Sequence, residues 1–137
     1  MVAVLVLDIL AVLHGRGALL ENHLDATYAC MKAVQDKHIQ ICTLSNSSPV
    51  LLERDTVLAA FVETYVDKTL FASDTGLYKP DRQALLSVAE LYSVDPAEVL
   101  LVDDSLSTIE EALTLGMKGI VYRNAEEVLS RIYAYIQ

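Results

Sequence analysis

Residues 2–8 read V-A-V-L-V-L-D and residues 99–104 read V-L-L-V-D-D. Each stretch is an unbroken apolar run that closes on an acidic residue, which is typical of a strand covered on both faces in a parallel sheet. If these two strands are neighbours, the carboxylates of Asp8, Asp103 and Asp104 converge on one small volume. Unpaired like charges there would raise their own pKa values and destabilise the fold. A bound divalent cation resolves the conflict, and an all-oxygen ligand set favours magnesium.

The rest of the chain alternates between strands and helices. Further strands are predicted at residues 39–44, 66–71 and 120–122, and helices near residues 20–34, 50–62, 79–91, 105–116 and 124–136. Because parallel strands separated by helices require right-handed crossovers, the pattern predicts an α/β fold. We expect a three-layer α/β/α sandwich formed by a single domain over residues 1–137. In such folds the chemistry gathers at the carboxyl ends of the strands.

The composition narrows the classes of partner. Hydrophobic residues make up 53% of the 137 residues, which is enough to form a core. The formal net charge of −9 repels phosphate-rich surfaces, so we expect neither nucleic acid nor membrane as a partner. The only cysteines, Cys30 and Cys42, are too few for a disulfide scaffold. We interpret both as reduced, buried thiols, which predicts a cytoplasmic protein.

Polar residues also follow the second and third predicted strands. Ser45 and Asn46 end the second strand, and Lys79 follows the third after a loop. Taken alone, Ser45 and Asn46 are explained equally well by helix capping. Lys79 taken alone is best explained as a residue of a solvated loop. Their order along the chain is what makes them candidates for a site.

Four segments carry a resemblance to a known family. They are V-L-V-L-D-I-L-A-V-L (4–13), T-L-S-N-S-S (43–48), Y-K-P-D (78–81) and L-L-V-D-D-S-L-S-T-I (100–109). In this order they resemble the four motifs of the haloacid dehalogenase-like hydrolases, and the resemblance spans nearly the whole chain. It implies a Rossmann-like sheet of five parallel strands in the order 5-4-1-2-3.

The resemblance implies roles for the residues that handle phosphate. Asp8 would be the catalytic nucleophile that takes up a phosphoryl group as an aspartyl phosphate. Ser45 would bind a non-bridging phosphate oxygen, and Asn46 would support the same phosphate-binding loop. Lys79 would be catalytic as well, since it would neutralise charge shared by Asp8 and the transferring group. A phosphorylated substrate is the implied partner.

The resemblance also implies a magnesium site. Asp8 and Asp104 would bind Mg²⁺ directly, whereas Asp103 would act through a metal-bound water. The family uses only the backbone carbonyl at the position of Leu10, so this residue is expected to serve as a ligand despite its side chain.

The first motif departs from the family pattern. Most phosphatases of the family carry a second Asp two residues after the nucleophile, followed by Gly, and here these positions are Leu10 and Ala11. The second Asp protonates the leaving oxygen and then activates water, and such groups typically supply about 10²–10⁴-fold in rate. A glycine would also allow a backbone conformation that the Cβ of Ala11 resists. We therefore expect magnesium and phosphate binding with slow chemistry.

Three functions stay open at this point. The first is a weak phosphohydrolase that prefers leaving groups stable without a proton, such as aryl or acyl phosphates. The second is a dehalogenase-type displacement by Asp8, which is less favoured because it leaves Asp103 and Asp104 without a cation. The third is a non-catalytic binding or regulatory module. A receiver domain fits the size, but its acidic pair should follow the first strand and here the pair follows the fourth.

The spacing of the motifs leaves no room for an inserted cap domain. Residues 13–43 and 47–78 hold little more than one predicted helix and one predicted strand each. We therefore expect an open site that acts on a large, even macromolecular, substrate or that borrows a lid from another copy in a homo-oligomer. His14 follows Asp8 closely, and we interpret it as a loop histidine that merely titrates near neutrality.

Overall fold

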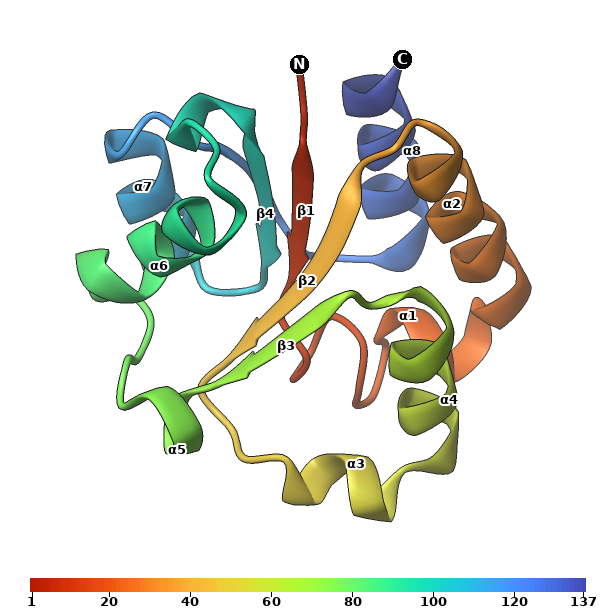
Figure 1. Cartoon of the computed structure of the whole chain (residues 1–137). Coiled ribbons are helices and arrows are strands. Elements are labelled where there is room, and N and C mark those ends of the chain that lie inside the picture. Colours follow the sequence, from red (N-terminus) through yellow and green to blue (C-terminus); the bar gives the residue numbers. More distant parts are fainter.

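The strands form one parallel sheet with β1 at its centre. The computed structural model describes residues 1–137, and its sheet has the order β3-β2-β1-β4-β5. The strands are β1 (Val4–Leu7), β2 (Gln40–Ser45), β3 (Lys68–Phe71), β4 (Val99–Asp103) and β5 (Lys118–Val121). Figure 1 shows the carboxyl ends of the labelled strands, β1 to β4, pointing toward the lower part of the view, away from both termini. The predicted order 5-4-1-2-3 is the same arrangement counted from the other edge, so it is confirmed.

Helices cover both faces of the sheet (Figure 1). One layer contains α1 (Leu19–Asn22), α2 (Leu24–Asp36), α4 (Thr56–Tyr65) and α8 (Ala125–Ile136). The opposite layer contains α6 (Arg82–Tyr92) and α7 (Leu106–Thr114). Two short helices, α3 (Val50–Arg54) and α5 (Ala72–Thr75), lie near the carboxyl ends of the strands, and the 3-10 turn η1 (Pro96–Glu98) precedes β4. The predicted three-layer sandwich is therefore the observed architecture.

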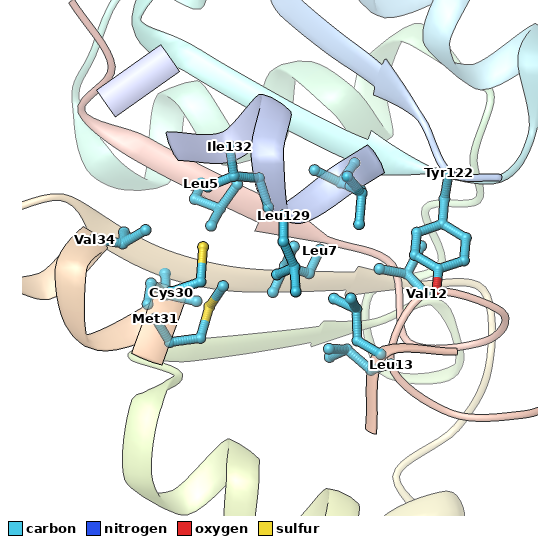
Figure 2. Packing of buried hydrophobic residues seen from close by; sticks show 14 of the residues in the cluster. Leu5, Leu7, Val12, Leu13, Cys30, Met31, Val34, Tyr122, Leu129 and Ile132 are labelled. Atoms are coloured by element: carbon cyan, nitrogen blue, oxygen red, sulfur yellow. The ribbon is translucent and has the colours of Figure 1, made fainter. Parts of the chain in front are cut away.

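Two hydrophobic clusters result from the alternation of side chains along each strand. Leu5 and Leu7 of β1 point into a larger cluster with α2 and α8, while Val4 and Val6 point into a smaller one with α6 and α7. Figure 2 shows the larger cluster, in which Leu129 and Ile132 of α8 approach β1. Because β1 is buried on both faces, its sequence has to be apolar at every position.

Two predicted helices are interrupted. The helical pattern at residues 20–34 breaks at His23, which separates α1 from α2, and the one at 50–62 breaks at Asp55. Asp55 starts α4 as its N-cap, with Oδ1 accepting the N–H of Leu58 at 3.0 Å. Ser105 and Asn124 are the N-caps of α7 and α8, since each side chain accepts a backbone N–H from the first turn of its helix. None of the helices combines the length and the apolar character that crossing a membrane would require.

No cap domain interrupts this sheet. The connection from β1 to β2 contains only α1 and α2, and the connection from β2 to β3 contains only α3 and α4. The carboxyl ends of the strands are consequently not covered by an inserted module at either point.

Candidate active site

The register of β1 against β4 brings the acidic residues together. Leu7 pairs with Val102, and the N–H of Asp8 donates to the carbonyl of Val102 at 3.0 Å. Asp103 ends β4 and Asp104 follows directly. Potential ligand oxygens of Asp8, Asp103 and Asp104 all lie within 4.8 Å of one another. The expected convergence of three carboxylates beside neighbouring strands is confirmed.

Lys79 lies between two of these carboxylates. Its ammonium Nζ donates to Asp8 Oδ1 at 2.8 Å and to Asp103 Oδ2 at 2.7 Å. The Lys79 side chain is only 4% exposed, so both ion pairs are shielded from solvent. Asp103 also accepts the N–H of Ser105 through Oδ1 at 2.9 Å. The interpretation of Lys79 as a solvated loop residue is therefore excluded.

Asn46 holds the backbone that carries Lys79. Its Oδ1 accepts the N–H of Lys79 at 2.8 Å, and its Nδ2 donates to the Lys79 carbonyl at 2.9 Å. Both polar groups of the amide are thus engaged with one residue that is 33 positions away in sequence. Asn46 does not cap α3, and the geometry instead makes it the residue that fixes the loop of Lys79.

Ser45 has no capping role either. It is the last residue of β2 and is 1% exposed, and its Oγ accepts the N–H of Ser47 at 3.1 Å. The same Oγ lies 2.6 Å from the hydroxyl of Ser47. The hydroxyl therefore stabilises the turn that leads from β2 to Asn46.

A cavity of about 170 Å³ opens over the carboxylates. Asp8, Lys79 and Asp104 line it, and Leu10, whose residue is 44% exposed, forms part of its apolar wall. A larger hollow of about 370 Å³ lies elsewhere, but it lacks the acidic cluster. The small cavity admits a compact group only, since pockets for whole small molecules usually measure about 300–1,000 Å³.

The electrostatics of the cluster favour a divalent cation. Burial raises the pKa of Asp8 to about 6, against the influence of Lys79 and reinforced by the negative charges of Asp103 and Asp104. Burial and the neighbouring Asp103 also raise the pKa of Asp104. Three carboxylates face one ammonium, and the ammonium of Lys79 pairs with Asp8 and Asp103. The three carboxylates and the ammonium together carry a net charge of about −2. Because hard oxygen ligands with a net negative charge suit Mg²⁺, the residues present fit this ion.

The raised pKa of Asp8 predicts a pH dependence of stability without metal. A folded-state pKa of about 6 against an ordinary value of 3.8 means that folding favours the protonated carboxyl. This contribution is fully present below pH 3.8 and is lost as the pH rises through 6. Between these two pH values, the free energy of unfolding of wild type should fall by on the order of 3 kcal/mol relative to that of Asp8→Asn, whose side chain is neutral throughout. Urea unfolding of both proteins in chelator at several pH values measures this, and parallel curves would contradict it.

A model of the family described as haloacid dehalogenase-like hydrolase matches residues 4–116 of this chain. The chain belongs to the haloacid dehalogenase-like hydrolases. The match begins with β1 and ends just after α7, so it includes every residue of the cluster around Lys79. The resemblance seen in the four sequence motifs is thereby confirmed at the level of the family.

The individual proteins to which this chain is similar have low sequence identity to it. Flavin mononucleotide hydrolase 1 of Arabidopsis thaliana is 27% identical over 67 residues, which are 49% of this chain and 27% of that protein. The chain therefore matches only about a quarter of the length of this curated relative. An uncharacterised protein from Corynebacterium glutamicum has the same fold, with a TM-score of 0.85, 20% identity and coverage of 99% and 96% of the two chains.

A third relative shares the fold over part of its length. It is a haloacid dehalogenase family enzyme from Bacteroides thetaiotaomicron, whose structure was solved with magnesium and inorganic phosphate. The TM-score is 0.58 at 20% identity, over 73% of this chain and 53% of that one.

Ala11 has a left-handed backbone conformation that glycine adopts more readily than alanine. Its φ is +73°, in the left-handed region that a Cβ disfavours by roughly 1–2 kcal/mol. Ala11→Gly should therefore raise the free energy of unfolding by about 1 kcal/mol. Ala26→Gly, in the exposed part of α2, is the matched control and should lower it by about 0.5–1 kcal/mol. Urea unfolding at constant m value tests both, and effects of equal sign would contradict the prediction.

His14 makes a contact that the sequence did not indicate. It lies in the loop after β1 as predicted, but its Nδ1 is 2.5 Å from Asp55 Oδ2. Burial alone would raise the pKa of Asp55, but the N–H of Leu58 and the His14 ring outweigh it and hold the pKa below its usual value. His14 lines the larger hollow and not the cavity of Asp8. The ring of His14 therefore ties this loop to the start of α4.

Proposed function

We propose that this protein is a magnesium-dependent phosphohydrolase of low intrinsic rate that acts through an aspartyl phosphate at Asp8. The observation that supports this best is the single cation of Lys79, held between Asp8 and Asp103 with Asp104 adjacent. Such a buried ion triad is costly to build, and it pairs a nucleophilic carboxylate with a charge that can stabilise a phosphoryl group.

The residues divide the work between attack and charge stabilisation. Asp8 Oδ1 is held by Lys79, so Oδ2 is the oxygen that attacks phosphorus. Asp103 positions Lys79 from the other side, and Asn46 fixes the Lys79 backbone. For Ser45, the role of binding a phosphate oxygen stays a prediction of the family resemblance, because its Oγ is engaged by Ser47 and the residue does not line the cavity.

Magnesium would be held by Asp8, Asp104 and the backbone carbonyl of Leu10, with Asp103 acting through a bound water. When bound, the ion would supply positive charge to the phosphoryl oxygens during transfer. Asp104 suits direct ligation because the residue is exposed and makes no ion pair with Lys79, whereas both oxygens of Asp103 already accept hydrogen bonds.

The wall of the cavity supports a restricted choice of substrate. Leu10 cannot protonate a leaving oxygen, so groups that depart as stable anions, such as aryl or acyl phosphates, should react fastest. The cavity of about 170 Å³ accepts the phosphoryl end alone. The remainder of the substrate would lie outside it, which suits a large phosphorylated partner or a lid supplied by a second copy.

An aryl phosphate assay tests this function. Wild type with Mg²⁺ should release phosphate slowly, and Asp8→Asn should lower the rate to the uncatalysed level because it removes the nucleophile. A chelator should have the same effect as Asp8→Asn. Asp25→Asn, an equal change of charge on the exposed side of α2, is the control and should keep the wild-type rate. Equal rates for wild type and Asp8→Asn would refute the proposal and favour a non-catalytic module, whereas metal-independent turnover of a haloacid would favour a dehalogenase.

A further inference from the structure

The two oxygens of Asp8 have different surroundings. Oδ1 accepts from Lys79 at 2.8 Å, while Oδ2 has no hydrogen-bond partner in the chain. The fully enclosed side-chain oxygens without a partner are those of Thr43 and Tyr92, so Asp8 Oδ2 is not sealed inside the protein. Asp8 also lines the cavity of about 170 Å³. One oxygen is thus fixed and the other can be reached by a phosphoryl donor.

The same cavity offers nothing that could activate water against a phosphorylated Asp8. Leu10 occupies the wall, and both oxygens of Asp103 are engaged by Lys79 and Ser105. Asp104 is the remaining carboxylate, and it is assigned above to the metal. His14 is paired with Asp55 and lines a different hollow. A general base usually contributes about 10²–10⁴-fold, so hydrolysis of the phosphorylated carboxylate should be slowed by this order.

The first chemical step does not have the same requirement. With an acyl phosphate donor, Asp8 Oδ2 forms a bond to phosphorus while the bond from phosphorus to the acyl oxygen breaks. The electron pair leaves with a carboxylate, which is stable without a proton, so no acid and no further reactant are needed. The missing carboxyl at position 10 therefore slows the removal of the phosphoryl group from Asp8 but does not slow its transfer to Asp8.

We infer that Asp8 is a phosphoryl-acceptor site whose aspartyl phosphate is long-lived, so that the protein stores a phosphoryl group received from small acyl phosphates. This inference rests on the proposed function, because it uses the same nucleophile, but it adds that the second step limits the cycle. The phosphorylated form would be the main species whenever the donor is present. Its negative charge would lie beside Leu10 and Lys79, at the uncovered edge of the sheet.

Acetyl phosphate and intact-protein mass spectrometry provide the test. Incubation of wild type with acetyl phosphate and Mg²⁺ should give a mass increase of one phosphoryl group on most chains, with a burst of about one acetate per chain before a slow phase. Asp8→Asn should give no adduct, and Asp25→Asn should give the wild-type adduct. After removal of the donor, the adduct of Leu10→Asp should decay about 10²-fold or more faster than that of wild type.

The outcomes separate this inference from the proposed function. Steady turnover of acetyl phosphate without burst or adduct would overturn the inference and leave the hydrolase intact. The absence of both adduct and turnover would overturn both. An adduct of Leu10→Asp that decays as slowly as that of wild type would show that position 10 does not set the lifetime. The burst and the adduct of wild type keep the inference testable even if Leu10→Asp does not fold.

Discussion

Lys79→Met is expected to lower the free energy of unfolding by about 3–5 kcal/mol at pH 7 in magnesium-free buffer. Methionine has nearly the same length as lysine but removes the cation that lies 2.8 Å from Asp8 and 2.7 Å from Asp103. Two buried carboxylates would then face each other and Asp104 without compensation. Burial already raises the pKa of Asp8 to about 6, so the ionised carboxylate is unfavourable in the folded protein even with Lys79 beside it.

Urea unfolding followed by circular dichroism measures the change. Lys32→Met is the matched control, because Lys32 loses the same charge at a side chain that is 72% exposed. That substitution should alter the free energy of unfolding by no more than about 0.5 kcal/mol. Saturating Mg²⁺ should restore part of the stability of Lys79→Met, since the ion replaces the missing charge. Equal effects of Lys79→Met and Lys32→Met would contradict the ion triad as a structural element.

The meeting of Asp8 with Asp103 and Asp104 could be predicted from sequence for a physical reason. An unbroken apolar run of five or six residues has few alternatives to a buried parallel strand, and the residue after such a run lies at the carboxyl edge. The resemblance of the motifs to the family predicts the order of the strands in the sheet. The observed pairing of Leu7 with Val102 agrees with that order. Burial of the strands therefore predicts the edge of the sheet at which the acids lie, and the family motifs predict that β1 and β4 are neighbours.

The side-chain contacts that support the site could not be predicted in the same way. Asn46 holds the backbone of Lys79 across 33 residues, and His14 pairs with Asp55 across 41. Hydrogen bonds between distant segments leave no periodicity in the sequence, and the same residue types are common in turns and caps. The break at Asp55 did have a local signal, since Asp followed by an apolar helix is a frequent N-cap. The apolar residues of 50–62 nevertheless keep a helical spacing across Asp55, so this spacing alone predicts one continuous helix.

Leu10→Asp is expected to raise the rate of aryl phosphate hydrolysis by about 10²–10⁴-fold in the presence of Mg²⁺. Leu10 lines the cavity with Asp8, and its residue is 44% exposed, so a carboxyl group can be placed there without opening the core. The new acid could protonate the leaving oxygen and afterwards activate water. Alkyl phosphates, whose alkoxide leaving groups depart poorly without a proton, should gain more in rate than aryl phosphates. This difference identifies proton transfer as the cause.

Leu10→Asn separates proton transfer from a change of polarity. Asparagine has the shape of aspartate but cannot exchange a proton, so it should leave the rate close to that of wild type. The strained conformation of Ala11, with φ +73°, could hold the new side chain away from the leaving group. The double variant Leu10→Asp with Ala11→Gly removes this obstacle and should be at least as active as Leu10→Asp. If neither aspartate variant exceeds Leu10→Asn in steady-state kcat, the missing carboxyl at position 10 is not what limits turnover, and the slow step must be sought in the geometry of Asp8 and Lys79.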